Sequence, residues 1–268
     1  MRAHESVRRL SESIVTAGDI ATFDLVKLNP DMDASFAAGV LNSTGLSVAP
    51  LGPGPITRYA TFEGLSGSDG TVLEASRPIG VDMVVANGTP LRTLLSRFKT
   101  HDHLFVLDAA EIKGVVAHAD LQLPIVGMPL LGLVVTLEQA LSHLIEEHTF
   151  GQWLELLPAS AQETVRDVYA DRQRHNTDIS MIECLNLTHR LTIAGSIPAI
   201  RTGLGYASAT SFKRFCRHTA NLRNVIAHGT GLLGASSDPI AAIEHFETIA
   251  VVAARAAALA DGGELTRP

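Results

Sequence analysis

Residues 81–121 read VDMVVANGTPLRTLLSRFKTHDHLFVLDAAEIKGVVAHADL, and this stretch sets the expected fold of the N-terminal half. Short apolar runs alternate with turn residues, and leucine and phenylalanine recur at helical spacing between the first two runs. Thr89 and Pro90 suit the N-cap and the first position of that helix. The pattern predicts a strand over 81–85, a helix from residue 90, a strand over 103–107, a tight turn, and a strand over 112–117.

The segment before this stretch is less regular. Residues 4–17 are expected to form a short amphipathic helix, and residues 34–41 a second helix. Residues 47–50 and 58–62 are expected to be extended, with loops rich in glycine and proline between them. Residues 19–70 therefore have the length of a second, weaker copy of the strand and helix pattern.

The stretch from Val81 to Asp120 resembles a CBS motif, in which a strand, a helix and two strands joined by a tight turn are followed by an Asp that opens a helix. CBS motifs occur in pairs. The resemblance therefore implies that residues 78–125 form the clearer motif and residues 19–70 a degenerate partner. Both would belong to a regulatory domain over residues 1–147 with α/β character.

The resemblance to CBS pairs also implies a ligand, because such pairs commonly form a cleft for adenine nucleotides. In the family, the Asp holds the ribose hydroxyls and a Ser or Thr three residues earlier contacts phosphate. Here these positions are Asp120 and Ala117, so the ribose contact is retained and the phosphate-binding hydroxyl is lost. The alternative is a purely structural or dimerising pair, in which Asp120 is only a helix N-cap.

After Pro158 the apolar residues recur with a helical period throughout, and we place the domain boundary near residues 147–150. Helices are expected over 128–147, 161–170, 179–193, 208–228 and 239–260. The predicted fold class is α+β, with an N-terminal α/β pair of motifs followed by an all-α helical domain over residues 148–268.

The string LRNVIAHG, residues 222–229, ends one of these helices. Arg223 is followed five positions later by His228, and Asn224 lies four residues before that histidine, on the same helix face. No acidic residue occurs between Glu183 and Asp238. A histidine near the end of a helix is suited to general acid–base work, and an adjacent guanidinium can bind two phosphate oxygens. We therefore predict that Arg223, Asn224 and His228 act on a phosphodiester.

A basic band precedes this motif on the same helix. Lys213 and Arg217 are four residues apart, and so are Arg214 and His218. These four side chains are the expected RNA-binding residues, since positive charge is what a polyanion needs. Glu183 is a candidate for orienting the Arg223 guanidinium across the bundle.

The motif resembles that of the HEPN family, which has an Arg, a polar residue, three residues and then a His on a late helix of a bundle. The resemblance implies a homodimer in which two such motifs face each other. Many HEPN domains are metal-independent endoribonucleases, and others are non-catalytic interaction modules. In RNA the 2′-hydroxyl is the nucleophile, so a His and an Arg suffice without a metal.

These resemblances lead to two candidate functions. The first is a stress- or defence-type, metal-independent endoribonuclease, with RNA as partner and an adenine nucleotide on the CBS pair as regulator. No cofactor is required for that chemistry. The second is a non-catalytic, ligand-sensing dimer that signals to a protein partner.

The composition limits the remaining classes. The 268-residue chain has a net charge of −7, which argues against a general DNA-coating protein. The apolar run from Ile125 to Leu137 is too short to span a bilayer, no signal peptide is visible, and a cytoplasmic protein without membrane contact is expected. Cys184 and Cys216 are expected to be reduced thiols. His101, Asp102 and His103 resemble a metal cluster, but no metal site is predicted because the sequence offers no third ligand position.

Overall fold

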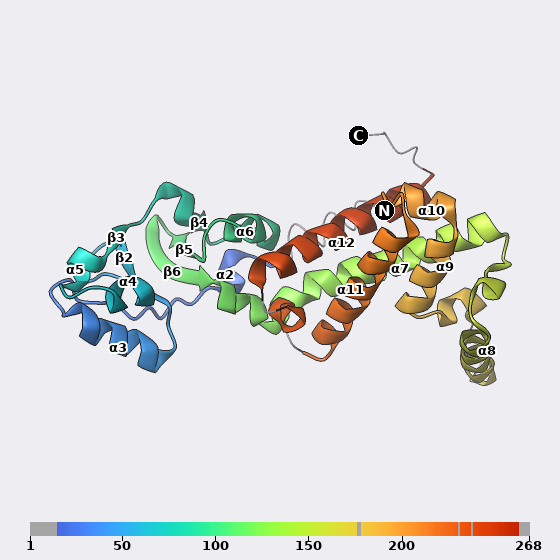
Figure 1. Cartoon of the computed structure of the whole chain (residues 1–268), viewed down its shortest axis with the longest axis horizontal. Helices are drawn as coiled ribbons and strands as arrows, with labels where there is room; N and C mark the ends of the chain where they lie inside the picture. The colour runs from blue at the N-terminus through green and yellow to red at the C-terminus, as the bar shows by residue number, and fades with distance from the viewer. Residues whose placement is uncertain (1–14, 176–177, 230, 237, 263–268) are drawn as a thin grey trace. The chain divides into compact units, whose positions relative to one another are not determined.

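The computed structural model describes residues 15–175, 178–229, 231–236 and 238–262. The chain divides into two compact units, one over residues 15–123 and the other from Pro124 onward. We call them the N-terminal unit and the helical unit (Figure 1). The helix expected over residues 4–17 lies almost wholly outside the described ranges.

The division between the units falls at Leu123 and Pro124 and not near residue 147, where the sequence pattern placed it. Helix α7, Pro124–Thr149, belongs to the helical unit because it packs against α9, α11 and α12. Its apolar residues cover most of its circumference, which is typical of a helix at the centre of a bundle.

The first half of the N-terminal unit contains a small antiparallel sheet. Its elements are α2 (Ala17–Ile20), α3 (Ala34–Thr44), β1 (Val48–Pro50), β2 (Arg58–Thr61), α4 (Phe62–Ser66), α5 (Val72–Ala75) and β3 (Arg77–Pro78), and the strand order is β1-β2-β3. The Asp33 carboxylate caps α3 by accepting a bond from the N–H of Phe36, and Gly45 ends the helix at a φ of 70°. Helix α3 and the two extended segments thus lie where the sequence predicts them.

The second half follows the predicted order of strand, helix, strand, turn and strand. Its elements are η1 (Val81–Met83), β4 (Val84–Ala86), α6 (Leu91–Phe98), β5 (His103–Asp108), β6 (Glu111–Ala117) and η2 (His118–Gln122). Strand β4 pairs with β5 in parallel, and β5 pairs with β6 antiparallel. Two boundaries differ from expectation, because a 3₁₀ turn precedes the first strand and Pro90, not Thr89, is the N-cap of α6.

The two sheets of the N-terminal unit share a core. Val48 and Tyr59 of the first sheet pack with Phe105 and Val115 of the second. Thr22, from the start of the unit, pairs with Val115 of β6, so the first segment of one half adds to the sheet of the other. The unit is therefore one folded body built from two related halves.

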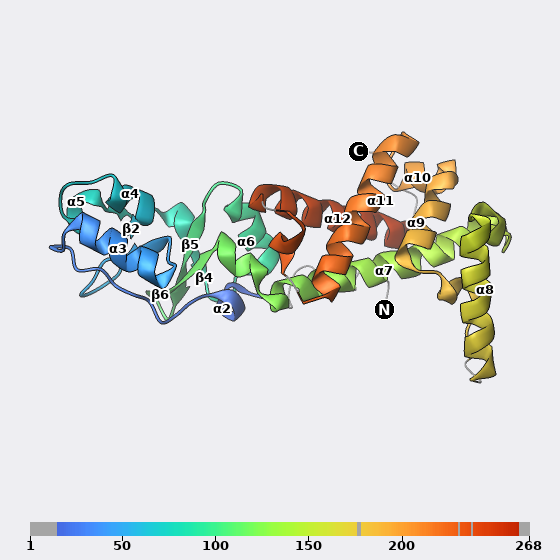
Figure 2. The ribbon, with the colours of Figure 1, turned by 60° about the horizontal axis from the view of Figure 1, so that its bottom comes forward.

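The helical unit is arranged around α7. Its further elements are η3 (Trp153–Leu156), α8 (Ala159–Arg174), η4 (Met181–Cys184), α9 (Leu187–Ser196), α10 (Pro198–Gly203), α11 (Ala209–Ala227), η5 (Leu232–Ala235) and α12 (Pro239–Ala260). Helix α12 runs alongside α7, and both α9 and α11 also pack on α7. Helix α8 projects from the end of the unit (Figure 2).

The helix predicted over 179–193 is interrupted in the structure. The Asn186 side chain accepts a hydrogen bond from the N–H of His189, so α9 starts afresh at residue 187. Ser180 and Glu183 form a capping box around the short turn before it. Short polar side chains that bond the local backbone favour helix ends over helix interiors, and this breaks the predicted helix into a short turn and α9.

Helix α7 is longer than the apolar run that the sequence pattern identified. It is the one helix in the described parts of the chain with the length and hydropathy of a membrane span, at 26 residues. More than half of its most apolar window is buried inside the protein, as in the core helix of a bundle. Pro129 lies in its second turn, and the helix continues through it.

Candidate functional site

Helix α11 positions the Arg223 motif by burying one face and exposing the other. Ser208 caps its N-terminus by accepting a bond from the N–H of Ser211. The buried face, spaced at helical intervals, consists of Phe212, Phe215, Thr219, Leu222 and Ile226. Arg223, Asn224 and His228 lie on the exposed side. The helical period therefore directs the polar part of the motif to solvent.

The end of α11 brings the three predicted residues together. His228 is the C-cap, and its N–H donates to the carbonyl of Asn224 at 3.1 Å. Gly229 follows with a φ of 80°, so the glycine ends the helix as predicted. The Arg223 guanidinium donates to the Asn224 side chain at 3.3 Å. Among the residues that the structure describes, neither Arg223 nor His228 forms an ion pair.

Glu138 of α7, which the sequence pattern did not single out, is the acidic residue whose charge interacts with that of Arg223. Burial raises the pKa of the Glu138 carboxyl, while the positive charges of Arg190 and Arg223 act to lower it. Glu183, the predicted partner, is exposed and accepts bonds from the backbone N–H and hydroxyl of Ser180 at 2.7 and 3.0 Å. Those bonds lower the pKa of Glu183. Glu183 is thus a capping residue.

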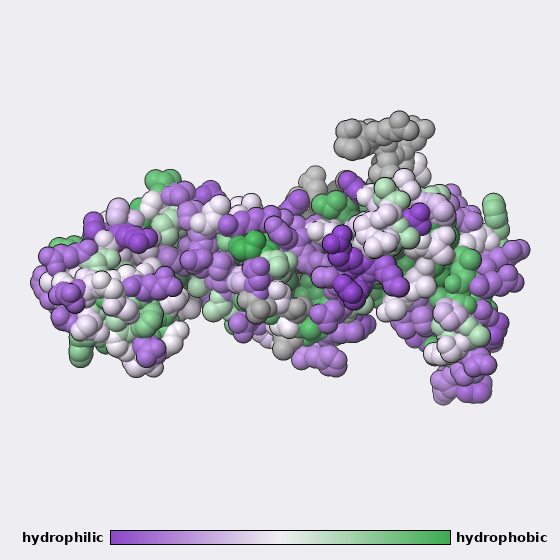
Figure 3. All heavy atoms as spheres, in the orientation of Figure 1, coloured by the Kyte–Doolittle hydropathy of each residue, from purple (hydrophilic) through white to green (hydrophobic). Residues whose placement is uncertain are grey.

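The predicted basic band is exposed along α11. Lys213, Arg214, Arg217 and His218 all lie on the solvent side of the helix, and strongly hydrophilic side chains gather over α11 in Figure 3. The His218 ring packs on that of His245 from α12, with the centroids 5.1 Å apart. The band is therefore available to a partner except where His218 packs on α12.

Arg190, by contrast, does not contribute to a positive surface. It is buried, and its guanidinium donates to the hydroxyl of Ser142 at 2.7 Å and to the carbonyls of Leu185 and Ile182. Arg201 donates to the carbonyl of Gly195 at 2.9 Å and is half-buried. The guanidinium groups of these two arginines bond to neighbouring segments of the helical unit. The positive field around Arg223 is therefore weaker than the number of arginines in the sequence implies.

In the N-terminal unit, Asp120 is a capping residue in the structure. Its carboxylate accepts a bond from the N–H of Ala117 at 2.7 Å, at the turn between β6 and η2. Burial raises the pKa of Asp120, and this hydrogen bond opposes the rise. Asp120 thus has the capping role that the sequence analysis gave as the alternative to ribose binding.

The equivalent turn in the first half carries the hydroxyl that the second half lacks. Thr61 ends β2 and its hydroxyl oxygen accepts a bond from the N–H of Gly64 at 3.2 Å. Gly64 stands three residues after Thr61, as Asp120 stands three residues after Ala117. At these positions the first half therefore has a hydroxyl without a carboxylate, and the second half has a carboxylate without a hydroxyl. The spacing of Thr61 and Gly64 could have indicated this.

A cavity of about 620 Å³ adjoins Thr61. Side chains with polar or aromatic groups in its lining are Asn42, Ser47, Tyr59, Thr61, Phe62, Glu63, Arg77, Thr100, His101, Asp102 and His103. Its lining comes from both halves of the unit and does not include Ala117 or Asp120. His101 lies 3.3 Å from the Asp82 carboxylate, and the buried His103 ring meets Tyr59 edge-on at 4.9 Å.

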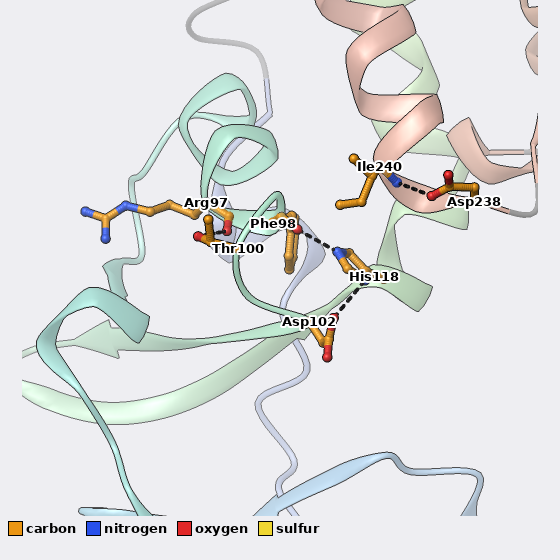
Figure 4. A network of polar contacts seen from close by, with 7 residues as sticks. All are labelled: Arg97, Phe98, Thr100, Asp102, His118, Asp238 and Ile240. Carbon is orange, nitrogen blue, oxygen red and sulfur yellow. Dashed lines mark hydrogen bonds and ion pairs between the residues drawn. The ribbon is translucent and has the colours of Figure 1, made fainter.

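A second polar network lies where α6 meets the ends of β5 and β6 (Figure 4). The His118 ring is 3.0 Å from the carbonyl of Phe98 through Nε2 and 3.8 Å from the Asp102 carboxylate through Nδ1. His101 and His118 thus each have a carboxylate as neighbour. Within the described ranges, no group of three or more His, Cys, Asp or Glu side chains is placed to hold a metal ion.

Comparison with known proteins gave matches among solved structures only. No protein-family model and no curated protein matches the chain. The chain is similar to a conserved protein from Pyrococcus horikoshii, with 16% identity over 41% of this chain and 91% of that one and a TM-score of 0.37. It is also similar to a CBS domain protein from Pyrobaculum aerophilum complexed with AMP, with 16% identity over 40% and 90% and a TM-score of 0.35. A third is the CBS domain of a bacterial CNNM/CorC family Mg²⁺ transporter in complex with ATP, with 16% identity over 48% and 94% and a TM-score of 0.37.

Proposed function

We propose that the helical unit is a metal-independent endoribonuclease of the HEPN type, and that the N-terminal unit is a CBS pair that regulates it by binding an adenine nucleotide. The observation that carries the nuclease proposal is the joint exposure of Arg223, Asn224 and His228 at the end of α11. An Arg and a His tied up in ion pairs would instead have favoured a structural role.

The proposed chemistry uses the RNA's own 2′-hydroxyl as nucleophile. His228, as general base, removes the proton of that hydroxyl, and the oxygen forms a bond to phosphorus. The bond from phosphorus to the 5′-oxygen breaks, and a second acid protonates the leaving oxygen. The Arg223 guanidinium stabilises the charge that develops on the non-bridging oxygens. Asn224, which accepts a bond from Arg223, holds the guanidinium in place.

The test of cleavage is incubation of the protein with RNA in the presence of a chelator. We expect products that end in 2′,3′-cyclic phosphate, and at least a hundredfold loss of activity in His228→Ala and in Arg223→Ala, because each removes a group that acts on the phosphate. His175→Ala is the matched control, since His175 is likewise an exposed C-cap histidine, on α8. Equal cleavage by the wild-type protein and His228→Ala would refute the proposal.

For the nucleotide we propose the 620 Å³ cavity beside Thr61, a volume typical of small-molecule sites. The Thr61 oxygen accepts a bond from Gly64, so its own hydrogen is free to donate to phosphate. The exposed Arg77 supplies positive charge on the same lining. The proposed nucleotide site is therefore the cavity beside Thr61, in place of the site at Ala117 and Asp120 that the sequence pattern favours.

Calorimetry with AMP, ADP and ATP tests this site. We expect binding that Thr61→Val and Arg77→Ala each weaken by about tenfold, the loss of one charge-assisted or hydroxyl contact. Arg92→Ala is the control, because Arg92 is exposed on α6 outside the cavity. If Asp120→Ala weakens binding and Thr61→Val does not, the nucleotide binds beside Asp120 instead.

The same cavity also favours a second function, because ligand binding there requires no chemistry in the helical unit. In that case the protein is a non-catalytic sensor that passes the state of its ligand to a protein partner. Nucleotide binding without any RNA cleavage would favour this function over the nuclease.

A further inference from the structure

A second cavity, of about 850 Å³, lies within the N-terminal unit, a volume typical of small-molecule sites. It is bounded by residues 23–27, by residues 54–56 between β1 and β2, and by the hairpin of β5 and β6. Its lining shares no residue with the cavity beside Thr61 and includes neither Ala117 nor Asp120. The cavity is therefore separate from both positions considered for the nucleotide.

The chain segment between Thr22 and Leu28 forms one wall of this cavity. Thr22 exchanges two backbone hydrogen bonds with Val115 of β6, at 2.9 and 3.0 Å. The N–H of Leu28 donates to the carbonyl of Pro50, and the carbonyl of Leu28 accepts from the N–H of Gly52, both at 3.0 Å. The wall is therefore fixed at one end to the second sheet and at the other end to the first.

The apolar part of the cavity includes the Phe23 ring. A Cβ at Gly114 of β6 would lie 3.1 Å from Cε1 of that ring, so the glycine gives the ring room to lie against the strand. Phe23 nevertheless remains 43% exposed. Leu25, Ile56 and Ile112 add buried or half-buried apolar side chains to the same lining. A ligand that covers Phe23 would remove apolar surface from water, which favours binding.

Lys27 supplies positive charge to the cavity. Its side-chain carbons lie close to Gly52, where a Cβ would be 3.1 Å from Cβ and Cδ of the lysine. The Lys27 side chain is exposed, and its ammonium forms no hydrogen bond or ion pair with the residues that the structure describes. Lys113, the other lysine in the lining, is 3.4 Å from the Asp108 carboxylate. Lys27 is therefore the ammonium group that is open to an anionic group of a ligand.

Two carboxylates, those of Asp24 and Glu111, line the same cavity. Both side chains are exposed, and neither is hydrogen-bonded or ion-paired within the described part of the chain. Asp24 lies three residues before Lys27 on the same wall, and Glu111 begins β6. The cavity thus combines an available cation and two available anions with an apolar surface. This combination is complementary to a ligand that carries both charges and an apolar group.

We infer that this cavity binds a free α-amino acid with a large apolar side chain. The α-carboxylate of the ligand accepts hydrogen bonds from Lys27, and its α-ammonium donates to Asp24 and Glu111. The apolar side chain of the ligand packs on Phe23 and Ile56. The inference goes beyond the proposed function, because it needs neither RNA cleavage nor a nucleotide in the cavity beside Thr61.

Nucleotides are the competing class of ligand, because a base could stack on Phe23 and a phosphate could bind Lys27. A phosphate carries about two negative charges, and Asp24 and Glu111 in the same lining repel it. An amine alone would leave Lys27 without an anion, and a carboxylic acid alone would leave the two carboxylates without a cation. An amino acid matches the charges and the apolar surface together.

Calorimetry with three ligands tests the inference. L-Tryptophan is the probe, tryptamine lacks its carboxylate, and indole-3-propionate lacks its ammonium. We expect L-tryptophan to bind at least about tenfold more tightly than either analogue, because each analogue loses one charge-assisted contact. Lys27→Met should weaken L-tryptophan and indole-3-propionate by about tenfold and leave tryptamine unchanged. Asp24→Asn combined with Glu111→Gln should weaken L-tryptophan and tryptamine and leave indole-3-propionate unchanged.

Three further variants serve as controls. Lys99→Met and Asp31→Asn change exposed charges outside both cavities and should leave the affinity for L-tryptophan unchanged. Thr61→Val should also leave it unchanged, because the two cavities share no lining residue. A loss of L-tryptophan binding in Thr61→Val but not in Lys27→Met would place the amino acid beside Thr61 and overturn the inference. Equal binding of L-tryptophan and tryptamine, or no binding of L-tryptophan, would overturn it as well.

Discussion

Two histidines, the buried His103 and the half-buried His245, are expected to make the protein sensitive to acid. Burial lowers the pKa of His103 to about 4 and that of His245 to about 4. In each case the folded state binds fewer protons than the unfolded state. The stabilisation is therefore fully present above a pH of about 6.5 and is lost as the pH falls toward 4. We expect each histidine to contribute at most about 1.4 kcal/mol per pH unit to this loss.

Melting temperatures measured from pH 7 to pH 4.5 would test this expectation. His103→Gln should flatten the pH dependence of the N-terminal unit, and His245→Gln that of the helical unit. Trp153, the single tryptophan, is buried in the helical unit, so its fluorescence reports the unfolding of that unit separately. A pH dependence that both variants retain in full would show that other groups are responsible.

Asp120 provides a test of capping against ligand binding. Because its carboxylate accepts the N–H of Ala117, Asp120→Ala should lower the free energy of unfolding by about 1 kcal/mol. Asp120→Asn keeps an acceptor oxygen and removes a charge that burial penalises, so it should leave stability at pH 7 within about 0.5 kcal/mol of the wild type. Urea unfolding curves of the two variants would give both changes in the free energy of unfolding. Equal destabilisation by the two variants would contradict the capping role.

At the residue scale, the sequence identifies groups that lie close together along the chain and misses those brought in from elsewhere. Arg223, Asn224 and His228 lie within six positions on one helix, so helical spacing alone places them together. Glu138 lies on another helix, and nothing in the local pattern of α7 distinguishes it from other polar positions. Glu183 was the wrong acidic partner because a capping box, a purely local interaction, directs its side chain to Ser180.

At the scale of elements, the contact between α7 and α11 determines where the motif sits. Gly127 of α7 is buried, and a Cβ at that position would lie 2.5 Å from Cγ2 of Ile226. Gly127→Ala should therefore force α11 to move and destabilise the protein by about 1–3 kcal/mol. We also expect it to reduce RNA cleavage, since Ile226 lies two residues before His228.

Gly39→Ala is the matched control for this helix contact. Gly39 is also a helical glycine, in α3, but it is exposed and a Cβ there would meet nothing within 4 Å. This substitution should raise stability by about 0.5–1 kcal/mol, because alanine loses less backbone entropy in a helix. Thermal unfolding of both variants tests the pair, and destabilisation by Gly39→Ala would show that helical glycines here are constrained for other reasons.

The elements were predicted well where turn residues and periodicity agree. The strands on either side of Ala109 and Ala110 follow from the apolar runs, and the helix expected over residues 34–41 is α3. The helix was expected from residue 128, four residues after its true start, because Pro124 within an apolar run looks like a helix breaker. Pro124 occupies the first position of the helix, where proline is tolerated, and the bundle around Pro129 supports a helix that continues through it. Only the tertiary contacts of α7 reveal the unit to which it belongs.

At the scale of the whole molecule, the proposed chemistry needs more than one chain provides. One motif presents one Arg and one His, but cleavage needs a base for the 2′-hydroxyl and an acid for the leaving oxygen. A two-fold interface repeats every residue, so a second copy would supply the missing His228 and a second Arg223. The exposed apolar side chains Met128 and Val135, two turns apart on α7, are surface that such an interface could cover. We therefore expect a homodimer, with twice the 28.5 kDa chain mass in sedimentation.

Mixing experiments would show whether the two copies share the active site. Wild-type chains are combined with an equal amount of His228→Ala chains under conditions that allow exchange. If each site needs a histidine from both chains, only wild-type pairs cleave RNA, and random pairing leaves about a quarter of the original activity per total protein. Independent sites would leave about half. A monomer that remains fully active at nanomolar concentration would contradict the shared site, and Arg223 and His228 of a single chain would then have to supply both proton transfers with water as the second acid.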